Sequence, residues 1–278
     1  MLSHSEADGN SLVNGQLKKG IGMWSSPTAQ ASLAASRVSW YYDWTPNQQT
    51  VLPGGGPPPG VEFVPMVWGA EDVTPARLAM AQALGTTLLG FNEPDRHDQA
   101  NMSVEQALAL WPQLVATGIR LGSPVAAELP WLQQFMSGAR ERGYRVDFVC
   151  LHWYGPDAAT WASGAAVQEL RDFLVAAHDQ FKLPIWLTEF ALVDWGMKSG
   201  RVKTVYGGMP TTEIGFPTWE QQAAFIRSAT GMLDTLPFVE RYAWFSLECY
   251  FSVPNDTLHM FGDDGVPTPA AVAYRSAR

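Results

Sequence analysis

The sequence predicts an α/β fold, a (β/α)8 TIM barrel, and three observations lead to this prediction. Eight short apolar runs recur along the 278 residues, helical patterns separate most of them, and two glutamates each close one of the runs. Nearly continuous apolar runs, without a polar residue at every second position, are typical of parallel strands covered on both faces. Alternation of strand and helix indicates a parallel α/β architecture, and eight strands favour a closed barrel.

The expected strands are rich in aromatic and β-branched residues, and several end at a polar residue or a proline. A doubly wound open sheet is the competing fold, but it needs a glycine-rich phosphate loop after the first strand, which residues 20–27 do not provide. The eight expected strands are residues 19–24, 37–44, 62–68, 86–93, 119–126, 147–154, 184–190 and 241–247.

The expected helices lie between these strands, and several begin with a residue that caps helices well. Thr74 precedes a proline, which is a common helix start, and Ser103 and Thr218 are candidate N-caps. The expected helices are residues 27–37, 74–84, 103–117, 130–143, 167–181, 218–233 and 268–277.

The unit after the second strand breaks this pattern. Residues 45–60 contain three consecutive glycines followed by three consecutive prolines, which cannot continue a helix. The barrel is therefore expected to be irregular, with this helix missing. The segments after strands 7 and 8 are long and aromatic, and long loops at the carboxyl end of a barrel usually form the binding cleft. Residues 19–278 are therefore expected to form a single catalytic domain, preceded by a polar extension at residues 1–18.

The composition limits which classes of ligand and which cellular locations fit this chain. The net charge of −9 argues against nucleic acid and anionic membranes as partners, whereas twelve tryptophans with only 16% charged residues suit a neutral ligand. Residues 1–20 lack the apolar core of a signal peptide, which fits either a secreted chain after cleavage or a cytoplasmic one. We expect an extracellular monomer, with the cytoplasm as the alternative location.

Cysteine and histidine spacing indicates neither a metal site nor a cofactor. The two cysteines, Cys150 and Cys249, show no metal-binding spacing, and whether they pair is open. The five histidines are not spaced as zinc ligands. We therefore predict that no metal or cofactor is needed.

The motif GFNEPD at residues 90–95 is the first of two candidate catalytic segments. Glu93 ends an apolar strand, Asn92 precedes it, and Pro94 stops further strand pairing. A carboxyl group at the carboxyl end of a barrel strand is placed for catalysis. The alternative is a structural turn, but a second glutamate at the end of a strand three units later favours catalysis.

That second glutamate is Glu189 in WLTEF, again at the end of an apolar strand. Burying a carboxylate there is unfavourable unless it is used or paired. The catalytic interpretation makes it a nucleophile. The structural alternative is an ion pair with Arg37, Arg96 or Arg241.

The motif LHWYG ends the sixth strand, next to the strand that bears Glu189. Its His152 and Tyr154 share one face, and a Tyr154 hydroxyl there can donate to the nucleophile. Aromatic rings recognise the apolar faces of sugars. The tryptophans expected to bind substrate are Trp44, Trp68, Trp153, Trp195 and Trp244.

At GFNEPD and WLTEF the sequence resembles the clan A glycoside hydrolases, and with LHWYG and WFSLE it resembles glycoside hydrolase family 128 over about residues 20–275. The resemblance implies a retaining endo-β-1,3-glucanase with Glu93 as acid/base and Glu189 as nucleophile. Asn92 matches the asparagine before the acid/base, His152 and Tyr154 match site positions on strand 6, and Trp244 matches a tryptophan beneath the reacting sugar.

A retaining mechanism implies that the two carboxyl groups lie about 5–5.5 Å apart. We also expect hydrogen-bond donors to keep the pKa of Glu189 low, so that it is ionised while Glu93 carries a proton. Two alternatives stay open: a clan A enzyme acting on another β-glucan or on mannan, and a non-catalytic barrel that only binds β-glucan. In each case the partner is a neutral polysaccharide or oligosaccharide.

Overall fold

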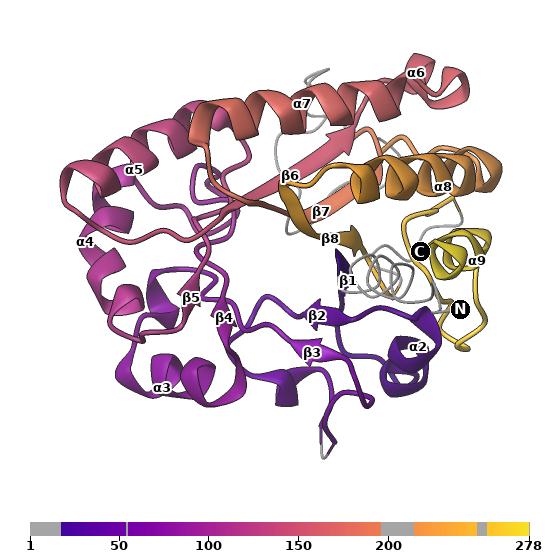
Figure 1. Cartoon of the computed structure of the whole chain (residues 1–278). Coiled ribbons are helices and arrows are strands. Elements are labelled where there is room, and N and C mark those ends of the chain that lie inside the picture. Colours follow the sequence, from indigo (N-terminus) through magenta and orange to yellow (C-terminus); the bar gives the residue numbers. More distant parts are fainter. Residues whose placement is uncertain (1–17, 54, 196–213, 249–254, 278) are drawn as a thin grey trace, which may run out of the picture.

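The computed structural model describes residues 18–53, 55–195, 214–248 and 255–277, and it shows strands surrounded by helices (Figure 1). Every strand overlaps one of the predicted runs. The boundaries agree to within three residues, except that β3, β4 and β5 each end five residues earlier than predicted. The strands are β1 Lys19–Gly22, β2 Trp40–Tyr42, β3 Glu62–Phe63, β4 Thr87–Leu88, β5 Arg120–Leu121, β6 Val149–Gly155, β7 Ile185–Leu192 and β8 Val239–Phe245.

The strands follow one another around a closed ring. Six of them pair in parallel in the order β3-β2-β1-β8-β7-β6, and β4 pairs with β5. Parallel bridges join the two groups on both sides, from Met66 to Leu89 and from Gly122 to Phe148. The pairing of β8 with β1 completes the ring, which confirms the predicted barrel.

The helices cover the outside of the ring, and their starts follow the predicted caps. Ser103 and Thr218 each form a reciprocal capping box, and the Thr74 side chain accepts the N–H of Arg77. A short helix at Ala158–Ser163 was not predicted. The helices are α2 Ala29–Ser36, α3 Pro75–Leu84, α4 Val104–Val115, α5 Leu129–Glu141, α6 Ala158–Ser163, α7 Ala165–Phe181, α8 Trp219–Thr235 and α9 Pro269–Ser276.

The unit between β2 and β3 has no α-helix among its described residues, as predicted. Only the short 3-10 turn η1, Gln48–Thr50, forms there, and the Asn47 side chain caps it. A second 3-10 turn, η2 at Ala70–Asp72, follows β3. This side of the ring in Figure 1 is accordingly less covered by helix than the side of α7 and α8.

Apolar side chains form two layers, one inside the ring of strands and one between the strands and the helices, because successive residues of a strand point to opposite faces. On β2, Trp40 and Tyr42 point into the ring, whereas Tyr41 packs toward the helices. On β6, Cys150 belongs to the inner layer and Leu151 to the outer one. The same alternation decides which side chains reach the cleft at the ends of the strands.

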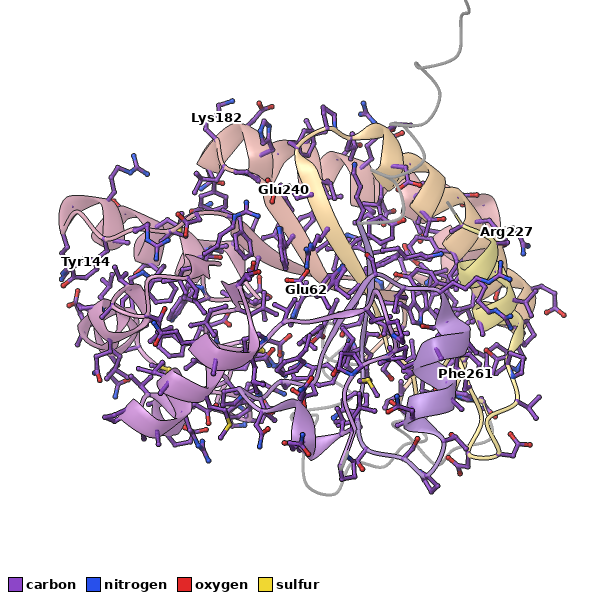
Figure 2. All side chains as sticks on the ribbon, turned by 60° about the horizontal axis from the view of Figure 1, so that its bottom comes forward. Glu62, Tyr144, Lys182, Arg227, Glu240 and Phe261 are labelled. Atoms are coloured by element: carbon purple, nitrogen blue, oxygen red, sulfur yellow. The ribbon has the colours of Figure 1, made fainter. Side chains whose placement is uncertain are left out.

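Ion pairs and stacked rings close the amino-terminal end of the ring. Arg241 pairs with Glu62 at 2.6 Å, and Arg120 pairs with Glu240 at 2.6 Å. Both arginines stack on the ring of Trp186. Glu62 and Glu240 lie toward the middle of the molecule in Figure 2. Arg241 is therefore engaged far from Glu189, at the opposite end of the strands.

Some predictions fall wholly or partly outside the described residues. Residues 1–17 lie outside them, so the polar extension and the division into domains stay predictions. Cys249 also lies outside them, and its pairing with Cys150, which is fully buried, stays open. Parts of the long segments after β7 and β8, residues 196–213 and 249–254, are likewise not described. No described helix is long and apolar enough to cross a membrane.

Candidate active site

Glu93 is placed by the junction of β4 with the loop that follows it. Asn92 forms a parallel bridge with Val125, and the Glu93 N–H donates to the Val125 carbonyl at 2.7 Å. The backbone of Glu93 then turns into the left-handed region, with φ of 38°, just before Pro94. This turn directs the Glu93 side chain to the carboxyl end of the ring, where it lines the cleft.

His152, Tyr154 and Glu189 come from the neighbouring strands β6 and β7. In the register of these strands His152 is the partner of Glu189, and the register shifts between Leu151 and His152. All three side chains line the same cleft as Glu93. The ring thus brings together two glutamates that are ninety-six residues apart in the chain.

The imidazole of His152 lies between the two carboxyl groups. Its Nδ1 is hydrogen-bonded to Oε1 of Glu93 at 3.1 Å, and its Nε2 lies 3.3 Å from Oε1 of Glu189. The second approach is close, but it does not have the geometry of a hydrogen bond. One carboxylate oxygen of each glutamate and one ring nitrogen of His152 all lie within 4.8 Å of one another.

Three neutral donors surround the carboxylate of Glu189. Tyr154 donates its hydroxyl to Oε2, the indole N–H of Trp44 donates to Oε1 at 3.0 Å, and the Tyr42 hydroxyl lies 3.2 Å from Oε1. The Tyr42 hydroxyl also lies 2.9 Å from the Thr188 carbonyl, and it has one proton to share between these acceptors. Burial raises the pKa of both tyrosines well above its ordinary value, so the hydroxyls stay protonated donors.

The expectation of a low pKa for Glu189 was wrong in direction. Burial raises the pKa of Glu189, and the nearby charge of Glu93 adds to this, while His152, Tyr154 and Trp44 oppose it. The Glu189 side chain is only 7% exposed. The sequence showed that donors were available, but it did not show that the carboxylate would be almost completely enclosed.

The charge of His152 is set by the same pair of glutamates. Burial acts to lower the pKa of His152, but the carboxylates of Glu189 and Glu93 favour the imidazolium, and the net direction is upward. A protonated ring here places one positive charge between two negative ones. Its charge therefore depends on the ionisation of both glutamates.

Polar residues in the segment after β4 contact Glu93 and Asn92. Arg96 lies 3.5 Å from Oε2 of Glu93 and 3.4 Å from Asp98. The Asn92 amide donates to Gln99 at 3.1 Å, while its buried carbonyl oxygen has no partner within the described part of the chain. Asn92 as a residue also lines the cleft.

A cleft of about 680 Å³ joins these groups, a size typical of small-molecule sites. Trp44, Trp68, Trp153 and Trp195 line it, as predicted. The indole of Trp153 also stacks on Phe225 of α8, because Trp153 points away from the inside of the barrel.

Three aromatic residues of the site were not among the expected substrate-binding residues. Trp24 and Phe245 border the cleft, and Tyr42 lies beneath Glu189. Trp24 and Phe245 follow or end strands of the ring, which is a signal that could have found them. Tyr42 gave no such signal, because its contact with Glu189 depends on closure of the ring.

Trp244 is a correction. It is fully buried, its indole N–H donates to the Leu258 carbonyl at 2.6 Å, and its ring packs against Phe190 and Tyr274. Alternation along β8 turns Trp244 toward the helices and its neighbour Phe245 toward the cleft. Trp244 therefore cannot stack on a bound sugar.

The cluster of Glu93, His152 and Glu189 is also the place, within the described ranges, where three ligand atoms are near enough to share a cation. The same atoms are engaged with one another by the contacts given above. That the reaction needs no metal or cofactor stays a prediction.

Comparison with known proteins agrees with this geometry. A family model described as the glycosyl hydrolase catalytic core matches residues 20–274. A crystal structure of a GH128 (subgroup I) endo-β-1,3-glucanase from Amycolatopsis mediterranei, in complex with laminaritriose, is 44% identical to this chain. The match covers 94% of this chain and 100% of that one, with a TM-score of 0.81. The chain belongs to glycoside hydrolase family 128.

More distant relatives of this family 128 enzyme match it in structure or in sequence. The GH128 (subgroup II) endo-β-1,3-glucanase from Sorangium cellulosum is 27% identical, with a TM-score of 0.69 over 94% of this chain and 98% of that one. Alkali-sensitive linkage protein 1 of Schizosaccharomyces pombe is 28% identical over 218 residues, which is 75% of this chain. The chain spans about a third of the length of that yeast protein (34%). The chain is thus a glycoside hydrolase.

Proposed function

We propose that this enzyme hydrolyses β-1,3-glucan with retention of configuration, using Glu93 as acid/base and Glu189 as nucleophile. The observation that carries the proposal is the close approach of the two carboxyl groups. One carboxylate oxygen of Glu93 and one of Glu189 lie within 4.8 Å of each other, and both residues line the cleft. Retaining enzymes hold these groups about 5–5.5 Å apart, whereas inverting enzymes leave about 6.5–9.5 Å for a water molecule. The separation therefore supports direct attack by one carboxylate.

The surroundings of the two glutamates support the assignment of roles. Glu189 accepts from Tyr154 and Trp44, and donors of this kind favour the ionised form that a nucleophile needs. Glu93 is more exposed, at 15% of its side chain against 7% for Glu189. An acid/base must exchange protons with the leaving oxygen and with water, so the more accessible carboxyl suits that role.

In the first step the bond between the anomeric carbon and the leaving oxygen breaks. Glu93 gives its proton to that oxygen, while a carboxylate oxygen of Glu189 forms a bond to the anomeric carbon. In the second step Glu93, now ionised, removes a proton from water as the water attacks the same carbon. The bond to Glu189 then breaks, which restores both carboxyl groups and leaves the product with its original configuration.

His152 links the two steps electrostatically. A protonated ring between Glu93 and Glu189 stabilises negative charge on either carboxylate, and the charge moves from Glu189 to Glu93 when the covalent bond forms. Asn92 lines the cleft next to Glu93 and is a candidate to hydrogen-bond a substrate hydroxyl near the reacting carbon. Trp68, Trp153 and Trp195 stay candidate substrate contacts.

The substrate assignment rests on the relatives. The Amycolatopsis enzyme is an endo-β-1,3-glucanase whose structures contain laminaritriose, laminaripentaose and laminarihexaose. Its identity of 44% over nearly the whole chain supports the same linkage and an endo action here. A polymeric glucan also favours action outside the cell. This location and the expected monomeric state stay predictions.

Incubation with linear β-1,3-glucan, followed by sizing of the products, tests the function. Wild-type enzyme should release oligosaccharides, and Glu93→Gln and Glu189→Gln should each lower the rate by orders of magnitude. Binding without new reducing ends would indicate a non-catalytic barrel. Faster cleavage of another β-glucan or of mannan would change the substrate assignment.

Stereochemistry tests the mechanism separately. Proton NMR of the first product should show the β-anomer, and an α-anomer would exclude retention. Azide should restore turnover differently in the two variants. Glu189→Gly should yield an α-glycosyl azide, because azide takes the place of the nucleophile, whereas Glu93→Ala should yield a β-glycosyl azide through the covalent intermediate.

A further inference from the structure

Within the described part of the chain, the nucleophile Glu189 has no arginine or lysine partner. The charged group in ion-pair range of its carboxylate is His152, and the remaining contacts given above are neutral donors. The donors to Oε1 come from the end of β2, where the indole N–H of Trp44 lies at 3.0 Å. An indole donor to a carboxylate fixes the direction of one oxygen without adding a charge.

Trp44 reaches this oxygen because its backbone takes an uncommon conformation. Its φ is 58°, in the left-handed region that bulky residues rarely adopt. Such a conformation persists where the surrounding structure holds it, and it is often found at functional sites. Here it follows β2 directly and turns the indole across the end of the ring toward Glu189.

Gly22 provides the space for the ring of Trp44. A Cβ atom added at Gly22 would lie 2.8 Å from Cη2 and 3.0 Å from Cζ2 of the indole, so a side chain there would displace it. The face of the indole is covered by Trp24, with ring centroids 4.4 Å apart and planes at 16°. Phe245 also meets the ring edge-on, at 5.9 Å. These contacts leave the indole little freedom to tilt away.

We propose that Trp44 is a positioning residue for the nucleophile rather than a surface for sugar stacking, and that Gly22 sets its place. This inference rests on the proposed role of Glu189. Trp44 is packed against Trp24 on one face, against Tyr42 at 4.8 Å and against the edge of Phe245, so stacking on the sugar falls to other rings of the cleft. Trp44 then acts on the rate of the chemical step, through the orientation and ionisation of Glu189.

Trp44→Phe tests this, because it keeps an aromatic ring and removes the donor. We expect kcat on linear β-1,3-glucan to fall about tenfold to a hundredfold, with KM changed less than about twofold, as for loss of one hydrogen bond to a charged group. The acidic limb of the pH profile of kcat/KM should move to higher pH, because the ionised nucleophile loses a donor. Gly22→Ala should shift kcat and the acidic limb in the same direction.

Trp131→Phe is the matched control. Trp131 lies in the first turn of α5 and donates its indole N–H to the Met102 carbonyl at 3.2 Å. Trp131→Phe therefore also removes one indole hydrogen bond, but not one to Glu189. This variant should leave kcat and the acidic limb unchanged.

A raised KM with unchanged kcat and acidic limb in Trp44→Phe would overturn the proposal and make Trp44 a sugar contact. Should Gly22→Ala not fold, Trp44→Phe alone decides. Failure of the proposed function is a different result, since the wild-type enzyme would then cleave no β-glucan, or Glu189→Gln would keep its rate.

Discussion

Glu248, just after β8, is a buried carboxyl group outside the catalytic pair, and we predict that it makes stability depend on pH. It is 7% exposed, and Oε2 accepts the Trp24 N–H at 2.9 Å. Its other oxygen, Oε1, has no partner within the described part of the chain. Burial raises the pKa of Glu248 from 4.5 to about 8, against the lowering effect of the Trp24 N–H.

The sign follows from proton binding. The folded protein holds this proton more tightly than the unfolded chain does, so Glu248 supports the fold below the unfolded pKa near 4.5. That support is lost as the pH rises through about 8. Since one pKa unit corresponds to about 1.4 kcal/mol, ionised Glu248 destabilises the protein by up to about 5 kcal/mol at pH 9.

Glu248→Gln keeps the shape of the protonated side chain and removes the charge. At about pH 9 its melting temperature should exceed that of the wild type by about 10 °C, and near pH 4.5 the two should agree. Thermal unfolding followed by circular dichroism measures both. Glu220→Gln, at an exposed position of α8, is the control for the change in net charge. An equal effect of both variants at both pH values would refute the reasoning.

Three further predictions concern the cleft. Tyr154→Phe should lower kcat about tenfold to a hundredfold and move the acidic limb to higher pH, since Glu189 loses a donor; an unmoved limb would contradict this. Glu189→Gln should raise the melting temperature at pH 7 but not near pH 4, because burial raises the pKa of Glu189 and its ionised form is unfavourable in the fold. Trp68→Ala should raise KM several-fold with little change in kcat, whereas an unchanged KM would remove Trp68 from the binding surface.

Much of the architecture could be predicted because it depends on local patterns. Apolar runs of strand length, capping residues such as Ser103 and Thr218, and the glycine and proline clusters before β3 act over a few residues. They therefore located the strands, the helix starts and the missing helix. They also placed Glu93 and Glu189 near the carboxyl ends of their strands, although β4 ends earlier, at Leu88, and β7 runs past Glu189 to Leu192.

The finer arrangement of the site depends on alternation and burial, which local patterns specify poorly. Trp244 and Phe245 are adjacent aromatic residues at a strand end, and the direction of each depends on the register of β8 against its neighbours. Likewise, the donors Tyr42 and Trp44 come from a strand far from Glu189 in the sequence. A short motif does not contain such contacts.

The sequence by itself determined the order of the elements, the chemical groups at the strand ends and the neutral character of the expected ligand. Only the tertiary structure decided which groups meet, because closing the ring of strands sets neighbours that are distant along the chain. It also enclosed Glu189 and so raised its pKa, since the solvation of a carboxyl group depends on every element packed around it.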